Sequence, residues 1–191
     1  EERATTLYVR VETSSSTQLP MTLWRPLDFV EDVNREMYGM GLYYGIMLVM
    51  IFYNGFLFLT VREPVYLHYV LYIASYTAFQ MSLNGLAFEF LWGDFPAWAN
   101  MCTPFFIACA GIFSGRFAQL YLQTETLSPR WHRFLGGYVV YSVGTAVLSL
   151  ALPYEWSIKL AVVAAAVWAP TMFFLGLDLM RKGHKSANYF F

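Results

Sequence analysis

The residue types most often used for covalent or metal chemistry are few in this chain and poorly spaced for it. Cys102 and Cys109 are seven positions apart. On a helix that spacing separates them by about 10 Å along the axis, too far for a disulfide, so we expect two small buried side chains. The three histidines fall in different predicted segments, and none lies three or four positions from a further pair of candidate metal ligands. They are His68, His132 and His184.

One short string resembles a catalytic motif. Residues 111–115, which include Ser114, are similar to the serine motif of intramembrane proteases. A serine nucleophile needs a base, and no histidine is predicted at bilayer depth on a later segment. Phosphate-binding loops, paired carboxylates and redox motifs are also missing from the sequence. The sequence therefore predicts no catalytic residue, no metal site and no cofactor.

Five polar or charged side chains fall within or at the ends of long apolar segments, where their burial in lipid is costly. Asn54, Gln80 and Asn84 are candidates for hydrogen bonds between two such segments, with Asn54 facing the side that carries Gln80 and Asn84. Packing alone, without a ligand role, is the simpler interpretation of all three. Arg116 and Asp178 fall at comparable depth and could pair, although Arg116 could equally extend to the membrane surface by itself.

Two pairs of glycines have the spacing that lets membrane helices approach closely. Gly41 and Gly45 form one pair, and Gly111 and Gly115 form the other. Each pair could form the contact surface of a homodimer. Packing within one bundle is the simpler alternative, and the sequence favours it.

The composition defines the environment that must hold these residues. Of the 191 residues, 58% are hydrophobic and 13% are charged, and the net charge is −1. Soluble domains carry about a quarter charged residues, so this chain has too little charge to cover a surface in water. A net charge near zero also provides no basic field for nucleic acid. A water-soluble enzyme domain, a disordered tail and a nucleic-acid-binding protein are thereby excluded, and a lipid bilayer is indicated.

The charged residues divide the chain into five uncharged runs of 25, 25, 21, 21 and 18 residues. A helix needs about 20 residues to cross the hydrocarbon core, so each run approaches or exceeds the required length. The alternating pattern of a membrane β-barrel is not present. We therefore predict an all-α membrane bundle over residues 37–185. Its expected spans cover residues 37–60, 65–89, 97–122, 135–153 and 159–180.

The basic residues predict the orientation of these spans. Seven lie in or beside the segments on one side of the predicted membrane, and only Lys159 lies in the opposite loops. Because basic residues accumulate in cytoplasmic loops, we expect the N-terminus to be outside. The seven residues are Arg62, Arg116, Arg130, Arg133, Arg181, Lys182 and Lys185.

The ends of the chain differ from the apolar centre. Residues 1–30 contain two short β-like stretches, 7–12 and 21–24, which we interpret as the last strands of an extracytoplasmic β-sandwich. Residues 31–36 would connect that domain to the first span. Residues 186–191 become apolar again and are expected to begin a sixth helix. The chain is therefore expected to be a fragment of a longer protein.

Several strings, taken in order, resemble the bacterial seven-transmembrane receptors with diverse intracellular signalling modules. In the first two spans they include Tyr-Asn-Gly-Phe at 53–56, Arg-Glu-Pro at 62–64 and Tyr-Leu-His-Tyr at 66–69. Further strings are residues 82–92, 115–117 with Leu120, and 127–133. Residues 8–12 with 23–24 are similar to the last strands of the sensor domain that precedes the membrane region in that family.

The resemblance implies a receptor region in the bacterial inner membrane. In that family an outer domain, thought to bind carbohydrates or other small molecules, is joined to seven helices. These lead to a cytoplasmic output module in the same chain, such as a diguanylate cyclase or a histidine kinase. A transporter or channel subunit is the alternative, with Pro170 as a possible helix kink, but charged residues inside the spans are scarce for such a path.

Overall fold

A computed structural model describes Arg10 and residues 21–181, and every regular element within these residues is an α-helix. The prediction of an all-α chain is confirmed for this part. The helices are α1 (Pro26–Val61), α2 (Pro64–Leu83), α3 (Leu86–Phe90), α4 (Pro96–Tyr121), α5 (Thr124–Leu127), α6 (Pro129–Ser149) and α7 (Tyr154–Arg181).

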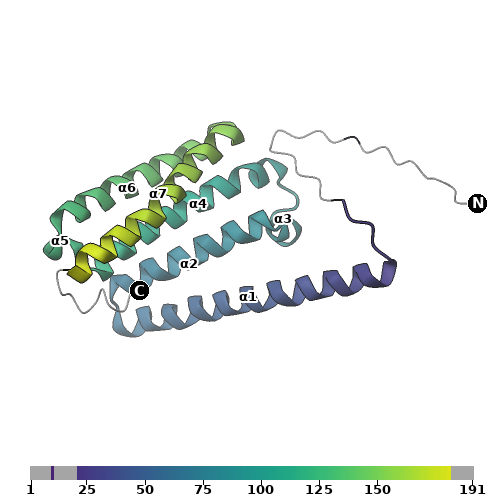
Figure 1. Ribbon diagram of the computed structural model, residues 1–191, viewed down its shortest axis with the longest axis horizontal. Helices are drawn as coiled ribbons and strands as arrows, with labels where there is room; N and C mark the ends of the chain where they lie inside the picture. The colour runs from purple at the N-terminus through teal and green to yellow at the C-terminus, as the bar shows by residue number, and fades with distance from the viewer. Residues whose placement is uncertain (1–9, 11–20, 182–191) are drawn as a thin grey trace, which may run out of the picture.

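Prolines begin four of these helices, because proline has no N–H to satisfy there and its φ already suits a helix. They are Pro26, Pro64, Pro96 and Pro129. The turns before α2, α3 and α5 are sharp and use left-handed residues, namely Arg62, Gly85 and Gln123. The chain therefore reverses direction over very few residues, which places consecutive long helices antiparallel (Figure 1).

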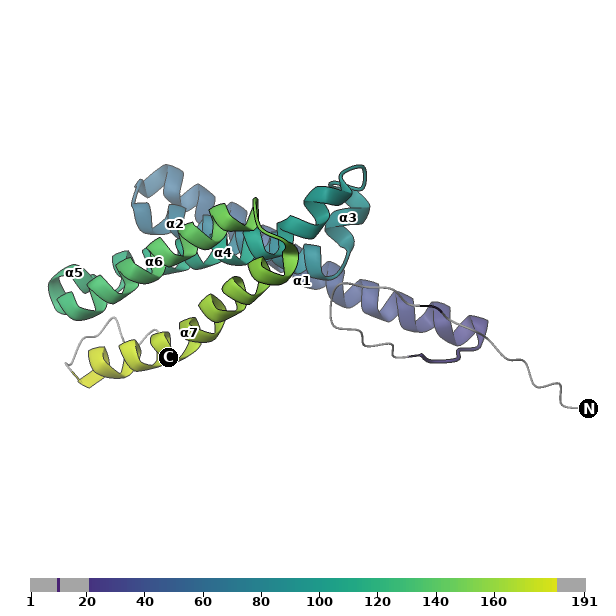
Figure 2. The same ribbon diagram turned by 90° about the horizontal axis from the view of Figure 1, so that it is seen from above.

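The long helices form a row in which α4 is central. Helix α1 packs on α2, α2 packs on α4, and α4 also contacts both α6 and α7 (Figures 1 and 2). Helices α6 and α7 pack on each other as well. Because α4 is the common neighbour of α2, α6 and α7, it joins the α1–α2 pair to the α6–α7 pair.

Three helices of the described residues are long and apolar enough to cross a bilayer: α1, α4 and α7. Helices α2 and α6, of 20 and 21 residues, run antiparallel beside them but are not among these three. Helix α2 contains four tyrosines and His68, and α6 begins with Arg130 and Arg133 close together. The three apolar helices agree with three of the five expected spans.

The N-terminal segment differs from the prediction. Helix α1 begins at Pro26, so residues 31–36, predicted as a connector, are helical and continuous with the first membrane span. Residues 21–25 have no regular secondary structure, and the strand predicted at 21–24 is not seen. The other predicted strand and the expected start of a sixth helix at 186–191 lie outside the described residues.

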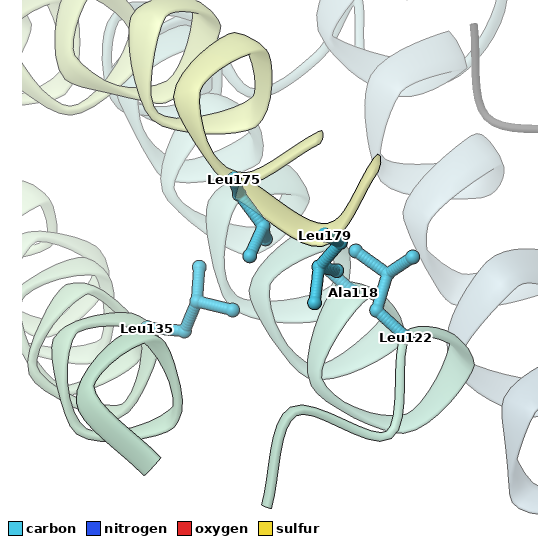
Figure 3. Close-up of a cluster of buried hydrophobic side chains, with 5 residues drawn as sticks. All are labelled: Ala118, Leu122, Leu135, Leu175 and Leu179. Carbon is cyan, nitrogen blue, oxygen red and sulfur yellow. The ribbon is translucent and has the colours of Figure 1, made fainter. Parts of the chain in front are cut away.

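A cluster of buried apolar side chains holds the α5 end of the bundle together. Leu135 of α6 and Leu175 of α7 are fully buried, and Leu179 is almost so. Figure 3 shows them converging on Ala118 and Leu122 at the end of α4. These side chains fix α4, α6 and α7 to one another at the end of the bundle where the arginines gather.

We expect Leu175→Ala to lower the free energy of unfolding by about 3 kcal/mol, because it leaves a cavity among close-packed helices. Leu59→Ala is the matched control, since Leu59 is 72% exposed and would face lipid. Denaturation of the purified protein in mixed micelles measures both changes. Equal losses in the two variants would contradict the assignment of this cluster as core.

Candidate functional site

The predicted polar residues of α1 and α2 do not bond to each other as expected. The Asn54 amide nitrogen donates to the Met50 carbonyl of its own helix at 2.9 Å, and the side chain is buried. Asn84 instead donates to the Tyr44 hydroxyl of α1, also at 2.9 Å. Gln80 lies on α2 with the Tyr43 hydroxyl as a neighbour.

The antiparallel arrangement of α1 and α2 explains this correction. Residues of the two helices face each other when they are equally far along the chain from the turn at Arg62. Asn84 is therefore level with Tyr44, near the α3 end of the bundle, whereas Asn54 lies closer to the turn. Spacing in the sequence placed Asn54 within an apolar helix, but Asn84, expected deep in the second span, is the exposed residue that ends α2. The register of the two helices could not be predicted.

Arg116 belongs to a hydrogen-bonded network that joins α4 to α6. Its pairing with Asp178 stays a prediction. Arg116 is exposed on α4, and its guanidinium donates to the Gln119 side-chain oxygen at 2.9 Å. The Gln119 amide nitrogen donates in turn to the His132 carbonyl of α6 at 3.0 Å.

Thr124 completes this network at the turn between α4 and α6. Its hydroxyl is fully buried, donates to the Gln119 carbonyl at 3.4 Å and lies 3.1 Å from Nδ1 of His132. The network therefore ties α4, α5 and α6 together beside the leucine cluster. The residue pattern alone does not distinguish Gln119 or Thr124 from other polar residues. The spacing of Arg116 and Gln119, three positions apart on a helix, was the only available signal.

The two glycine pairs have different surroundings. A Cβ on Gly111 would lie 2.8 Å from Oγ of Ser142, and one on Gly115 would lie 2.7 Å from Cγ2 of Val139. These glycines therefore allow α4 and α6 to approach closely. A Cβ on Gly41 or on Gly45 would meet no atom within 4 Å, so this face of α1 is open.

A cavity of about 280 Å³ lies over the Gly111 region of α4, between α2 and α7. Its walls are mainly aromatic: Tyr72 and Tyr76 from α2, Tyr138 from α6 and Trp168 from α7. Tyr138 and Trp168 stack with ring centroids 5.0 Å apart. All of the lining residues are uncharged, so the cavity suits an apolar occupant or movement of the helices around it.

This cavity leaves little trace in the sequence. Its one signal was the pair of tyrosines at 72 and 76, which the helical repeat places on the same face. In the part of the chain that the structure describes, no three His, Cys, Asp or Glu side chains gather where they could hold a metal ion. Cys102 and Cys109 are free thiols on α4. His184 lies outside the described residues.

Comparison with known families identifies the bundle. A family model described as 7TM diverse intracellular signalling matches residues 36–191, which include the membrane part of α1 and every later helix. The chain belongs to this family. Comparisons with curated proteins and with solved structures gave no match. As a 7TM diverse intracellular signalling protein, the chain is an integral membrane protein and a transmembrane region of a signalling receptor.

We expect Gly115→Ala to lower the free energy of unfolding by about 1 to 3 kcal/mol, because the added methyl group would collide with a β-branched side chain that cannot rotate away cheaply. Gly41→Ala is the matched control and should change stability by less than about 0.5 kcal/mol, since its surroundings are open. Unfolding in mixed micelles measures both. A larger loss from Gly41→Ala would show that the α1 face, not the α4 face, is the packed one.

Proposed function

We propose that this receptor region relays the binding of an outer ligand to a cytoplasmic output module in the same chain. The observation that carries this proposal is the length of α1, which runs without a break for 36 residues from Pro26 to Val61. At about 1.5 Å per residue it extends about 54 Å, well beyond a hydrocarbon core of about 30 Å. The first span and the segment before it are therefore one rigid rod.

The start of α1 has the properties of a segment in water. It carries Asp28, Glu31, Asp32, Arg35 and Glu36, and an Arg35–Glu31 ion pair of 3.7 Å lies one helical turn apart on its surface. Figure 1 shows this end of α1 extending past the other helices. An outer sensor domain attached here could tilt or shift α1 directly. A flexible linker in the same place would absorb that motion.

The packing of the bundle supports a path from α1 to the other helices. Motion of α1 would act first on α2, its main neighbour, and then on α4. Helix α4 contacts both α6 and α7. A shift of α4 would therefore move the C-terminal end of α7. An outer ligand could drive such a change only through different affinities for the two arrangements.

The proposal also places five spans, α1, α2, α4, α6 and α7, in the bacterial inner membrane with the N-terminus outside. Arg62, Arg116, Arg130, Arg133 and Arg181 lie toward the same end of the bundle, and Lys159 lies toward the other (Figure 1). This asymmetry is typical of a cytoplasmic arginine-rich end. Helix α2 spans 20 residues and α6 spans 21, which suits a crossing of about 30 Å.

The ligand, the output and the oligomer remain predictions. We propose a carbohydrate or another small molecule outside, and a diguanylate cyclase or histidine kinase inside, as the family resemblance implies. A homodimer would use the open Gly41–Gly45 face of α1. A transporter or channel is not favoured, because the residues that line the central cavity carry no charge.

The test is to break α1 between the outer segment and the membrane. We expect Asn34→Pro to abolish the response of the full receptor's output to ligands found in a panel of soluble sugars and small molecules. Proline breaks a helix interior, and Asn34 is exposed on α1, so the change should act through the backbone alone. Asn34→Ala, which keeps the helix, should respond normally.

A second measurement needs no ligand. Spin labels at Asp28 and Val61 should give one narrow distance of about 50 Å, because 33 helical steps separate them. Asn34→Pro should broaden and shorten that distribution, whereas Asn34→Ala should not. A full response in the proline variant, or a broad distribution in the unmodified protein, would overturn the proposed relay.

A further inference from the structure

We propose that the groove between α6 and α7 is a binding site for an anionic phospholipid of the cytoplasmic leaflet. The groove has a volume of about 660 Å³ and is lined by residues of both helices, including Arg130, Trp131, Phe134, Val167, Pro170 and Phe174. It lies on the side of the bundle away from α1, where α7 runs beside α6 (Figure 2).

The groove continues along the two helices. A second hollow of about 330 Å³ shares Phe134 and Val167 with the first, and its wall includes Arg133 and Tyr141. The two hollows together form a long channel rather than a compact pocket. Such a shape fits an extended acyl chain better than a compact, ring-shaped molecule.

The charges lie at one end of this channel. Arg130 and Arg133 are three positions apart on α6, so they are neighbours on the helix surface. Both are exposed, and neither makes an ion pair or a hydrogen bond with another residue in the described part of the chain. Two free guanidinium groups can bind one phosphate through several charged hydrogen bonds.

The polarity of the channel changes in the same order as the parts of a phospholipid. The arginines lie at the arginine-rich end of the bundle, at the level expected for headgroups. Trp131 lies between the two arginines along α6 and Phe134 follows them, with ring centroids 5.9 Å apart, and aromatic rings favour the membrane interface. Beyond them, toward the bilayer centre, the wall is formed by Val167 and Ala166.

This gradient decides between the possible occupants. A free anion would satisfy only the arginines, and an apolar helix would leave both of them unpaired in the membrane interface. A molecule with a phosphate at one end and a hydrocarbon chain at the other satisfies the whole channel. Basic pockets between membrane helices at the cytoplasmic surface are known to bind anionic lipid headgroups.

The test is native mass spectrometry of the intact protein with phosphatidylglycerol or phosphatidylcholine that carry identical acyl chains. We expect one phosphatidylglycerol to be retained preferentially, with an affinity that falls as salt is added. Arg130→Gln should weaken this binding about fivefold, and the double variant with Arg133→Gln should weaken it further. Arg130→Lys keeps the charge and should retain most of the preference.

Matched controls distinguish lipid binding in this groove from non-specific attraction of anionic lipid to basic residues at the membrane surface. Arg62→Gln removes the same charge at the same membrane surface, but on the α1 side of the bundle, and should leave binding unchanged. Ala166→Leu narrows the groove and should weaken binding, whereas Ala169→Leu, an exposed residue of α7 outside the groove lining, should not.

The proposal also predicts that the deacylated headgroup, glycerophosphoglycerol, binds far more weakly than the whole lipid. Equal retention of the two lipids, equal effects of Arg130→Gln and Arg62→Gln, or no effect of Ala166→Leu would overturn it. A dimer that forms through this groove and excludes lipid would overturn it as well.

Discussion

The bilayer core offers no water to bond with, and the rest of the structure depends on this constraint. Each backbone group must therefore be satisfied within a helix, and polar side chains in the spans gain from partners close by. Several side chains bond to the carbonyl one turn earlier in their own helix: Asn54 to Met50, Ser82 to Ala78, Thr145 to Tyr141 and Thr171 to Val167. These local bonds satisfy polar residues within the spans, and small residues and dispersion contacts contribute much of the packing between helices.

Helix α4 is where that packing is concentrated. Its buried side includes Ala108, Gly111, Ser114, Gly115 and Ala118, so neighbouring helices approach its backbone closely. Helix α1 is the opposite case, since Asn54 is its only buried residue in the described structure. Helix α4 is therefore tightly packed at the centre of the bundle, whereas α1 has few buried contacts at its edge. A rod held lightly at one edge of a tightly packed centre can move as a unit, as a relay requires.

The charge distribution was enough to predict that the described part of the chain is all-α, because charged residues are excluded from long apolar segments. The charge distribution could not predict the register between neighbouring helices, or which face of each helix packs against a neighbour. Gly41 and Gly111 have identical spacing to their partners, yet only the second pair meets a neighbouring helix. The hydrogen bond from Asn84 to Tyr44, and the meeting of Tyr138 with Trp168, depend on the relative positions of helices that are distant in the sequence. The helical start of α1 was missed because residues 31–36 are charged, which marks the membrane boundary but not the helix end.

Placement of five helices across the membrane is the central claim, and cysteine labelling in intact cells tests it most directly. In a background in which Cys102 and Cys109 are replaced, single substitutions Asp94→Cys and Glu155→Cys should react with a membrane-impermeant maleimide added outside. Glu63→Cys and Glu125→Cys should react only after the cells are opened, because these residues lie at the opposite end of the bundle. Labelling of positions 63 and 94 from the same side would mean that α2 does not cross, and would contradict the account.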